Sequence, residues 1–239
     1  MSAAGTLYLV PSDLGAPAPA CLLPEATLSV VHRLHHFVVE DAKTARRYLK
    51  AIAHPRPLRE LMFSVLDEHT SASATGALLH PLQEGHDVGL MSEAGCPAVA
   101  DPGAALVRRA HQAGLRVVPL VGPSAILLAL MASGTNGQRF TFHGYLPVEP
   151  AARRTRIAQL ELQSARDDAT QIFIETPYRN EALLEALLAV CRPDTMLSIS
   201  ANLTAENELV STRTIAEWKR RKPDLARRPT VFVLYRGAS

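Results

Sequence analysis

The stretch that most constrains the fold of this chain runs from Asp87 to Gly103. It opens with a short apolar run, Val88 to Met91, which predicts a buried strand. A turn of small residues follows, Ser92 to Pro97, and the apolar spacing after Gly103 predicts a helix. A strand, a glycine- and proline-rich turn and a helix form the unit of an open α/β sheet, which binds ligands at the carboxyl ends of its strands. The same pattern is also typical of an ordinary strand-to-helix connection, and both interpretations stay open at this point.

Three residues of this stretch have specific consequences. Gly95 has no side chain, so a ligand can approach the backbone there closely. Asp101 can cap the following helix, with Pro102 at the first helical position. Cys96 lies in the same turn, but no base that could activate its thiol is adjacent in the sequence. We therefore expect Cys96 to be a small buried residue and not a nucleophile.

Strand-like and helix-like segments alternate along the rest of the chain. Strands are predicted over residues 7–10, 37–39, 61–66, 88–91, 116–120, 141–144, 171–175, 196–200, 208–212 and 230–235. Helices are predicted over residues 26–34, 44–52, 72–84, 103–113, 124–133, 151–166, 180–190 and 215–221. The helix over 44–52 is basic, and the helix over 124–133 is so apolar that we expect it to be buried.

This alternation predicts an α/β protein with two α/β domains. We place the first domain at residues 1–121 and the second at residues 122–239, with the boundary at a glycine–proline junction, Gly122-Pro123. The first domain alternates regularly, which favours a mostly parallel sheet. The last strands follow one another without long helices, so we expect a mixed sheet in the second domain.

Composition narrows the class of protein only moderately. Lys plus Arg is 25 and Asp plus Glu is 23, and a net charge of +2 neither requires nor excludes a nucleic-acid partner. The three cysteines form no Cys-x-x-Cys motif, which argues against a zinc site and a disulfide framework. The lack of a disulfide framework suits a reducing cytoplasm, so we expect a cytoplasmic protein. No apolar run is long enough to span a bilayer and the first residues do not resemble a secretion signal, so we expect no membrane contact. The histidines His32, His35 and His36 have helical spacing, but they lie where a helix should end, so we expect no metal site.

The usual cofactor fingerprints are missing from the chain. It has no Gly-x-Gly-x-x-Gly, no P-loop lysine motif and no Gly-x-Ser-x-Gly. Instead, four small-residue turns follow apolar strands, at residues 11–15, 92–97, 122–125 and 176–178. Such turns offer backbone N–H and C=O groups, which suit an uncharged or zwitterionic ligand with an apolar body, such as an adenine nucleoside. Four ordinary loops would give the same pattern.

Several strings spread over nearly the whole chain carry a resemblance to a known family. The longest are Ser92-Glu93-Ala94-Gly95-Cys96-Pro97, continuing to Asp101-Pro102-Gly103, and Arg116-Val117-Val118-Pro119-Leu120-Val121-Gly122-Pro123-Ser124. Shorter ones are Glu40-Asp41, Gly144-Tyr145-Leu146-Pro147 and Ile174-Glu175-Thr176-Pro177-Tyr178-Arg179. On these strings the chain resembles the tetrapyrrole methylase superfamily of S-adenosylmethionine (SAM)-dependent methyltransferases. It looks most like the branch that methylates a ribose 2′-hydroxyl of small-subunit ribosomal RNA.

The resemblance implies two α/β domains, a homodimer, and SAM bound in a cleft between the domains. It implies cofactor contacts at Pro11, Leu14, Glu93, Ala94, Gly95, Cys96, Ser124, Ala125, Tyr178, Ala201 and Thr230. Glu40 and Asp41 end a strand that should face the same crevice, so we expect them to position the acceptor or remove its proton. Capping of the next helix by Asp41 is an equally good interpretation.

Departures from the ribosomal branch fall at positions expected to contact the cofactor or the acceptor. Pro11-Ser12-Asp13-Leu14-Gly15-Ala16-Pro17 stands where the branch has Pro-Thr-Pro-Ile-Gly-Asn-Leu, and Ala42-Lys43 stands where it has Thr-Arg. Glu93 replaces an aspartate and Cys96 a threonine. The acceptor therefore stays open between ribosomal RNA, which makes the small ribosomal subunit a partner, and a tetrapyrrole or other small molecule. A SAM-binding protein without catalysis is a third possibility.

Two basic clusters bear on this choice. One consists of Arg153, Arg154 and Arg156, and the other of Lys219-Arg220-Arg221-Lys222 with Arg227 and Arg228. Both could bind RNA phosphates. A solvated helix face is the alternative interpretation of such runs.

Overall fold

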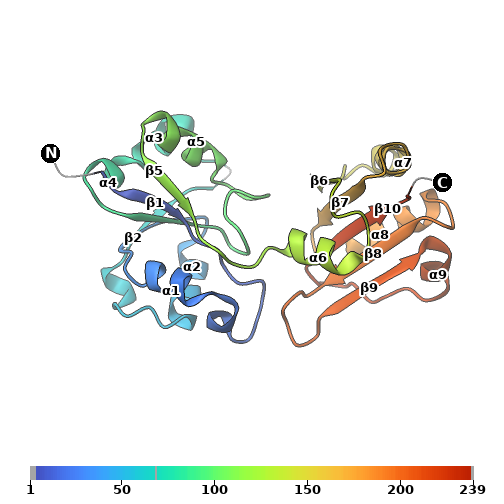
Figure 1. Ribbon diagram of the computed structural model, residues 1–239, viewed down its shortest axis with the longest axis horizontal. Coiled ribbons are helices and arrows are strands. Elements are labelled where there is room, and N and C mark those ends of the chain that lie inside the picture. The colour runs from blue at the N-terminus through green and yellow to red at the C-terminus, as the bar shows by residue number, and fades with distance from the viewer. Residues whose placement is uncertain (1–3, 68, 238–239) are drawn as a thin grey trace. The chain divides into compact units, whose positions relative to one another are not determined.

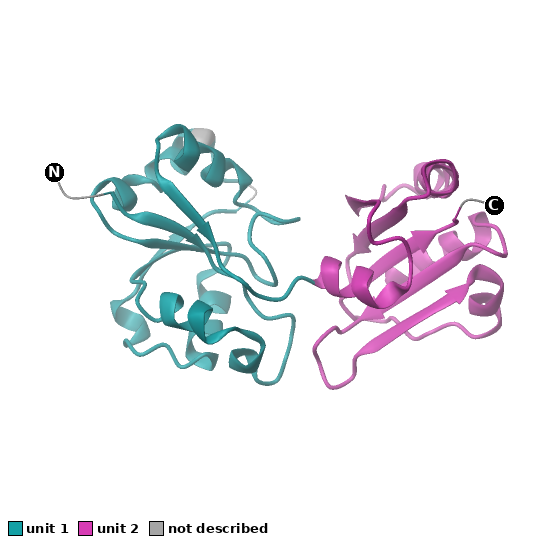
Figure 2. Ribbon diagram, viewed as in Figure 1, with its two compact units in different colours: residues 1–124 teal, residues 125–239 magenta. Residues whose placement is uncertain are grey.

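The computed structural model describes residues 4–67 and 69–237. The chain divides into two compact units, Met1–Ser124 and Ala125–Ser239, coloured separately in Figure 2. Each unit contains one five-stranded sheet with its helices, and each is described below by itself.

The first unit is built on a fully parallel sheet (Figure 1). Its strands are β1 (Thr6–Leu9), β2 (His36–Val39), β3 (Met62–Val65), β4 (Val88–Met91) and β5 (Arg116–Pro119), in the spatial order β3-β2-β4-β1-β5. Every neighbouring pair is parallel. The carboxyl ends of all five strands therefore lie at one edge of the sheet, and the turns that follow them meet there.

Helices connect these strands. They are η1 (Pro19–Leu22), α1 (Glu25–Val31), α2 (Ala42–Ala51), η2 (Leu58–Glu60), α3 (Ala72–Ala77), α4 (His80–Gln83) and α5 (Ala104–Gln112). The single helix predicted over residues 72–84 is wrong, because the structure has two short helices with a break before His80. Pro81 explains the break, since it has no N–H to bond to the carbonyl four residues earlier.

The predicted cap of α5 is also wrong. The N-cap is Gly103, whose φ of 137° lies in a region that favours glycine, and the helix begins only at Ala104. Asp101 lies two residues before this bend, so its side chain does not cap the helix. Asp101 is partly buried instead.

The second unit has a mixed sheet. Its strands are β6 (Phe140–Tyr145), β7 (Thr170–Glu175), β8 (Met196–Ala201), β9 (Leu209–Thr214) and β10 (Thr230–Tyr235), in the order β6-β7-β10-β8-β9. The pair β6–β7 is parallel and the other three pairs are antiparallel. The prediction of two α/β domains, with a mostly parallel first sheet and a mixed second sheet, is confirmed.

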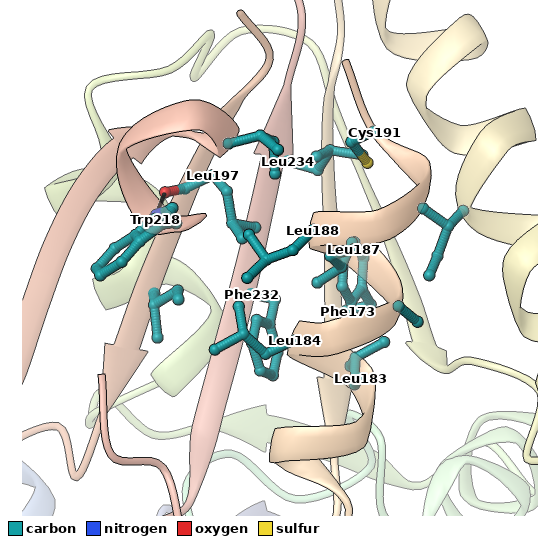
Figure 3. Close-up of a cluster of buried hydrophobic side chains, with 14 of the residues drawn as sticks. Phe173, Leu183, Leu184, Leu187, Leu188, Cys191, Leu197, Trp218, Phe232 and Leu234 are labelled. Atoms are coloured by element: carbon teal, nitrogen blue, oxygen red, sulfur yellow. Dashed lines mark hydrogen bonds between the residues drawn. The ribbon is translucent and has the colours of Figure 1, made fainter. Parts of the chain in front are cut away.

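Helices of the second unit are α6 (Ala125–Ser133), α7 (Pro150–Asp167), α8 (Asn180–Val190) and α9 (Ile215–Arg220). Figure 3 shows the core between α8 and the sheet, where leucines of α8 meet Phe173 and Phe232. The two phenylalanine rings stack with their centroids 5.9 Å apart. The indole N–H of the buried Trp218 donates to the carbonyl oxygen of Leu197 at 2.8 Å, so the core leaves no indole donor unsatisfied.

The expectation that residues 124–133 form a wholly buried helix is wrong. Helix α6 packs against β8, β9 and β10, but only Ala129, Leu130 and Ser133 are buried. Leu127 is 52% exposed and Met131 is 78% exposed. A helix lying on the face of a sheet buries one side only, whatever the composition of its other side.

Candidate functional site

Two of the small-residue turns in the first unit are joined by hydrogen bonds. The turn after β1 and the turn after β4 exchange backbone bonds, from Ser12 N–H to the Gly95 carbonyl at 2.8 Å and from Gly95 N–H to the Asp13 carbonyl at 3.3 Å. The hydroxyl of Ser12 adds a bond to the carbonyl of Ser92 at 2.8 Å. Because residues about 80 positions apart are held in this way, the two turns form one continuous wall at the edge of the sheet.

The turn after β5 completes this wall. A Cβ at Gly122 would lie 2.2 Å from Cγ of Pro11, so these two backbones approach as closely as only glycine permits. The thiol of Cys96 lies 3.5 Å from the Pro123 carbonyl oxygen. A Cβ at Gly95 would lie 3.3 Å from Cδ2 of Leu14. Four predicted cofactor residues, Pro11, Leu14, Gly95 and Cys96, thus lie together in this part of the structure.

Two side chains donate hydrogen bonds to backbone carbonyls of this wall, and neither was predicted from the sequence. The hydroxyl of Tyr48, on α2, donates to the Pro11 carbonyl at 2.9 Å, and the hydroxyl of Thr27 donates to the Val121 carbonyl at 2.8 Å. Burial raises the pKa of Tyr48, so its phenol stays a donor at physiological pH. Neither residue carries a sequence signal, because each is an ordinary buried position of an amphipathic helix.

The turn after β4 is conformationally strained. Besides Gly95, with a φ of 72°, the alanines Ala98 and Ala100 both adopt a φ of 65°. Left-handed alanines are unfavourable, and such residues concentrate at ligand sites. Burial raises the pKa of Asp101, and the negative charge of the nearby Glu93 raises it further, whereas a hydrogen bond from Ser92 lowers it. The predicted cofactor residues Glu93 and Ala94 are exposed on this turn.

Cys96 has the properties of a buried thiol. It is partly buried, and burial raises its pKa above the ordinary value, so the thiolate needed for nucleophilic attack is disfavoured. This agrees with its interpretation as a small packing residue.

Glu40 and Asp41 follow directly after β2, at the same edge of the sheet as the wall. Strand β2 is the parallel neighbour of β4, so the two carboxylates lie beside the turn after β4 in strand order. Asp41 is the N-cap of α2 and its Oδ1 accepts from Thr44 N–H at 2.7 Å. Hydrogen bonds from Thr44 lower the pKa of Asp41, which makes this carboxylate a weak base and a good fixed acceptor.

The predicted cofactor residues of the second unit gather at one end of its sheet. Thr230, at the start of β10, is paired with Ala201 on one side and with Glu175 on the other. Ala201 and Thr230 are buried, so Ala201 can offer a ligand only its backbone. Tyr178 follows the end of β7 and is 81% exposed. Ala125 begins α6, and Ser124, the last residue of the first unit, directly precedes it; both are half-buried.

Sequence reasoning also missed the side chains that fix the turn before Tyr178. Glu175 Oε1 accepts from Nη2 of Arg179 at 2.6 Å and from Thr176 N–H at 2.7 Å. Asn180 donates to the carbonyl of Arg228 at 2.7 Å. The string Glu175-Thr176-Pro177-Tyr178-Arg179 contains both members of this ion pair, but their contact depends on the turn between β7 and α8, which the sequence does not specify.

The two basic clusters differ in accessibility. Arg153 is buried, and Nη2 of Arg156 donates to Nδ1 of His143 at 3.2 Å, so only Arg154 of the first cluster is fully exposed. Burial of Arg153 contradicts both interpretations of this residue, as a phosphate ligand and as part of a solvated face. Arg153 lies on the same face of α7 as Ile157 and Leu160, at i, i+4 and i+7, and this face packs toward the core. The second cluster is exposed from Lys219 to Lys222, with Lys222 paired to Glu185 at 2.5 Å.

Neither a metal cluster nor a membrane-spanning helix is present in the described part of the chain. Over residues 4–67 and 69–237, His, Cys, Asp and Glu side chains form no group of three or more that could hold a metal ion. Within the same residues, every helix is too short or too polar to cross a membrane.

Comparison with known proteins identifies the family. The sequence profile of the Tetrapyrrole (Corrin/Porphyrin) Methylases matches residues 7–219. A protein of Xylella fastidiosa named Ribosomal RNA small subunit methyltransferase I is 34% identical over 90% of this chain and 75% of its own length. A Haemophilus influenzae protein of the same name is 29% identical over 96% of this chain and 78% of its own length.

A solved structure supports the fold. The crystal structure of the methyltransferase CobJ covers 98% of this chain and 94% of its own, with a TM-score of 0.64 and 19% sequence identity. The resemblance noted in the sequence is therefore confirmed by the family profile and by the relatives. The chain belongs to the tetrapyrrole (corrin/porphyrin) methylase family, and it is a methyltransferase that takes its methyl group from S-adenosylmethionine.

Proposed function

We propose that this methyltransferase acts on small-subunit ribosomal RNA and transfers the methyl group to a ribose 2′-hydroxyl. The observation that carries the proposal is the name shared by the relatives, Ribosomal RNA small subunit methyltransferase I, at 34% and 29% identity over nearly the whole chain. The resemblance to the 2′-hydroxyl branch supports the choice of atom. The string Glu40-Asp41 is retained from that branch, although Ala42 and Lys43 differ from it.

We propose that both units contribute to SAM binding. In the first unit the contacts are Pro11, Leu14, Glu93, Ala94, Gly95 and Cys96, which belong to the hydrogen-bonded turns after β1 and β4. In the second unit they are Ala125, Tyr178, Ala201 and Thr230, with Ser124 just before α6. Backbone groups and an exposed aromatic ring suit the adenosine part of SAM, which is polar at its edges and apolar on its faces.

The reaction requires little covalent help from the protein. The sulfonium of SAM is already a strong electrophile, so the protein has to align acceptor oxygen, methyl carbon and sulfur. The C–O bond forms as the S–C bond breaks, and the hydroxyl proton passes to a base or to solvent. Since its pKa is lowered, Asp41 serves better to hold the ribose hydroxyl by a hydrogen bond than to remove its proton. Glu40, one residue earlier at the same sheet edge, is the second proposed acceptor-side residue.

We also propose that the protein is a cytoplasmic homodimer. Ribosomal RNA as acceptor requires the compartment of the ribosome. The family resemblance suggests the dimer. Light scattering should give twice the chain mass at micromolar concentration, and a monomer mass would contradict this part of the proposal.

The acceptor is tested with labelled SAM and extract from a strain that lacks the gene. We expect label in RNA of the small ribosomal subunit. A 2′-O-methyl group blocks alkaline cleavage of the neighbouring phosphodiester, so the label should survive in an alkali-resistant dinucleotide. The variant Asp41→Asn, which retains a capping side chain, is the matched control and should incorporate less label. Label in a small molecule would refute the RNA acceptor, and label in an alkali-sensitive nucleotide would refute the 2′-hydroxyl.

A further inference from the structure

Helix α2 carries a stripe of four positive charges along one face. Lys43, Arg46, Arg47 and Lys50 are spaced i, i+3, i+4 and i+7, and all four are exposed. The opposite side of the helix is buried through Ala45, Tyr48 and Leu49. We call the four cations the α2 basic face. The whole chain has a net charge of only +2, so this face concentrates positive charge far beyond the average of the surface.

This arrangement does not help the helix to fold. The segment Ala42–Ala51 contains no acidic residue, and none of the four cations forms an ion pair with an acidic side chain of the described residues. The pairs Lys43–Arg47 and Arg46–Lys50 are like charges at i,i+4 spacing, which destabilise a helix. Of the four cations, only Lys50 lies in the last turn of the helix, where a positive charge interacts favourably with the helix dipole. Like charges gathered at this spacing without acidic ion-pair partners are typical of a surface that binds an anion.

One of the four side chains is held in place by an aromatic ring. The guanidinium carbon of Arg46 lies 4.6 Å from the ring centroid of Phe63, which belongs to β3. Strand β3 is an edge strand of the sheet. The Phe63 ring is half-buried and stacks on Phe37, so it serves to orient Arg46. One guanidinium nitrogen of Arg46 donates to the Ala42 carbonyl at 3.5 Å, and the other N–H groups stay available for phosphate oxygens.

The basic character continues beyond the helix. Arg56 and Arg59, which follow α2 on the segment that leads into and through η2, are exposed, with Glu60 as the adjacent acidic residue. Helix α2 packs against η2, so these cations belong to the same part of the first unit as α2. Asp41, at the other end, precedes the first cation. The face therefore begins next to the proposed acceptor-side carboxylates and extends away from them.

We propose that the α2 basic face binds the sugar–phosphate backbone of the acceptor RNA next to the nucleotide that is methylated. This inference rests on the proposed function and adds the surface by which the RNA is held. From Lys43 to Lys50 the helix rises about 10 Å, which is the axial length of roughly three nucleotides of a base-stacked strand at about 3.4 Å each. A convex row of long cations suits an extended polyanion. A tetrapyrrole or another small molecule would instead require a concave pocket.

The test is the salt dependence of binding of the full chain to protein-free small-subunit ribosomal RNA. The variant K43Q/R47Q/K50Q removes three charges, and glutamine has nearly the same helix propensity as lysine and arginine. If three phosphate contacts are lost, the slope of log K against log salt should become less negative by about 2–3 units. The affinity for SAM should stay at its wild-type value, because these side chains lie outside the turns assigned to the cofactor. The Tm should not fall, because the variant removes like charges at i,i+4 spacing. The double variant K43Q/K50Q should change the slope by roughly 1.5 units.

The matched control is R108Q/R116Q/R192Q, which removes the same charge from exposed positions on α5, β5 and the segment after α8. We expect its slope to stay near the wild-type value. An equal change in control and α2 variants would show that net charge alone matters and would overturn the inference. If the α2 variants lose binding to vesicles containing phosphatidylserine but keep the wild-type slope on RNA, the surface is a membrane site and the inference is also overturned.

Failure of the wild-type chain to methylate and bind ribosomal RNA would refute the proposed function itself. Normal methylation with an unchanged slope in the α2 variants would refute only this inference.

Discussion

The glycine in the turn after β4 allows the proposed cofactor wall to be tested against a matched position. Gly95 and Gly114 have almost the same backbone conformation, with φ values of 72° and 69°, and both lie in the first unit. Alanine at either position should cost about 1 kcal/mol of left-handed strain. A Cβ at Gly114 would have no neighbour within 4 Å, whereas a Cβ at Gly95 would lie 3.3 Å from Leu14 and 3.7 Å from the Pro123 carbonyl oxygen. These contacts require only a small adjustment, so the two variants should have similar stability.

Binding of SAM should separate the two variants clearly. Each alanine should lower the Tm by about 2–4 °C. We expect wild-type affinity near micromolar, about −8 kcal/mol, and we expect it unchanged in Gly114→Ala. In Gly95→Ala a methyl group stands at the closest approach to the proposed ligand, so the affinity should fall at least tenfold, or about 1.4 kcal/mol. Calorimetry measures both affinities and thermal unfolding provides the control. Wild-type SAM affinity in Gly95→Ala would show that this turn is structural only.

Three further predictions follow from individual contacts. Asp41→Ala should lower the Tm by about 2–4 °C, because it removes the side chain that caps α2. Asp41→Asn keeps a capping side chain, so it should keep the Tm and lower only kcat. Equal Tm values for the two variants would contradict the capping role. Leu187→Ala, at a fully buried position, should destabilise the second unit by about 2–5 kcal/mol in denaturant unfolding, and a loss below 1 kcal/mol would contradict its place in the core. Burial lowers the pKa of His143 below 6.5, and the nearby charge of Arg156 lowers it further, whereas the hydrogen bond to Gln171 acts in the opposite direction. The folded state therefore favours the neutral ring. Stability should therefore fall as the pH drops below about 6.5, and His143→Gln should flatten that fall in a series of Tm measurements.

The site could be predicted in part because its chemistry depends on the backbone. Small residues after apolar strands mark turns wherever they occur, and parallel strands bring such turns to one edge. This places the turns of Pro11, Gly95 and Gly122 together without knowledge of any side-chain contact. Tyr48, which holds the Pro11 carbonyl, could not be found in this way. Its partner is 37 residues away, and its own pattern indicates only burial.

The sequence by itself determined the architecture. Continuous apolar runs such as Val88–Met91 specify strands buried on both faces, and their alternation with helices leads to parallel pairing. Only the tertiary structure decided which side of each helix is covered. Met131 is exposed and Arg153 is buried, although composition and charge indicate the opposite. The physical reason is that periodicity is a property of one segment, whereas burial depends on the neighbours that distant parts of the chain bring to it.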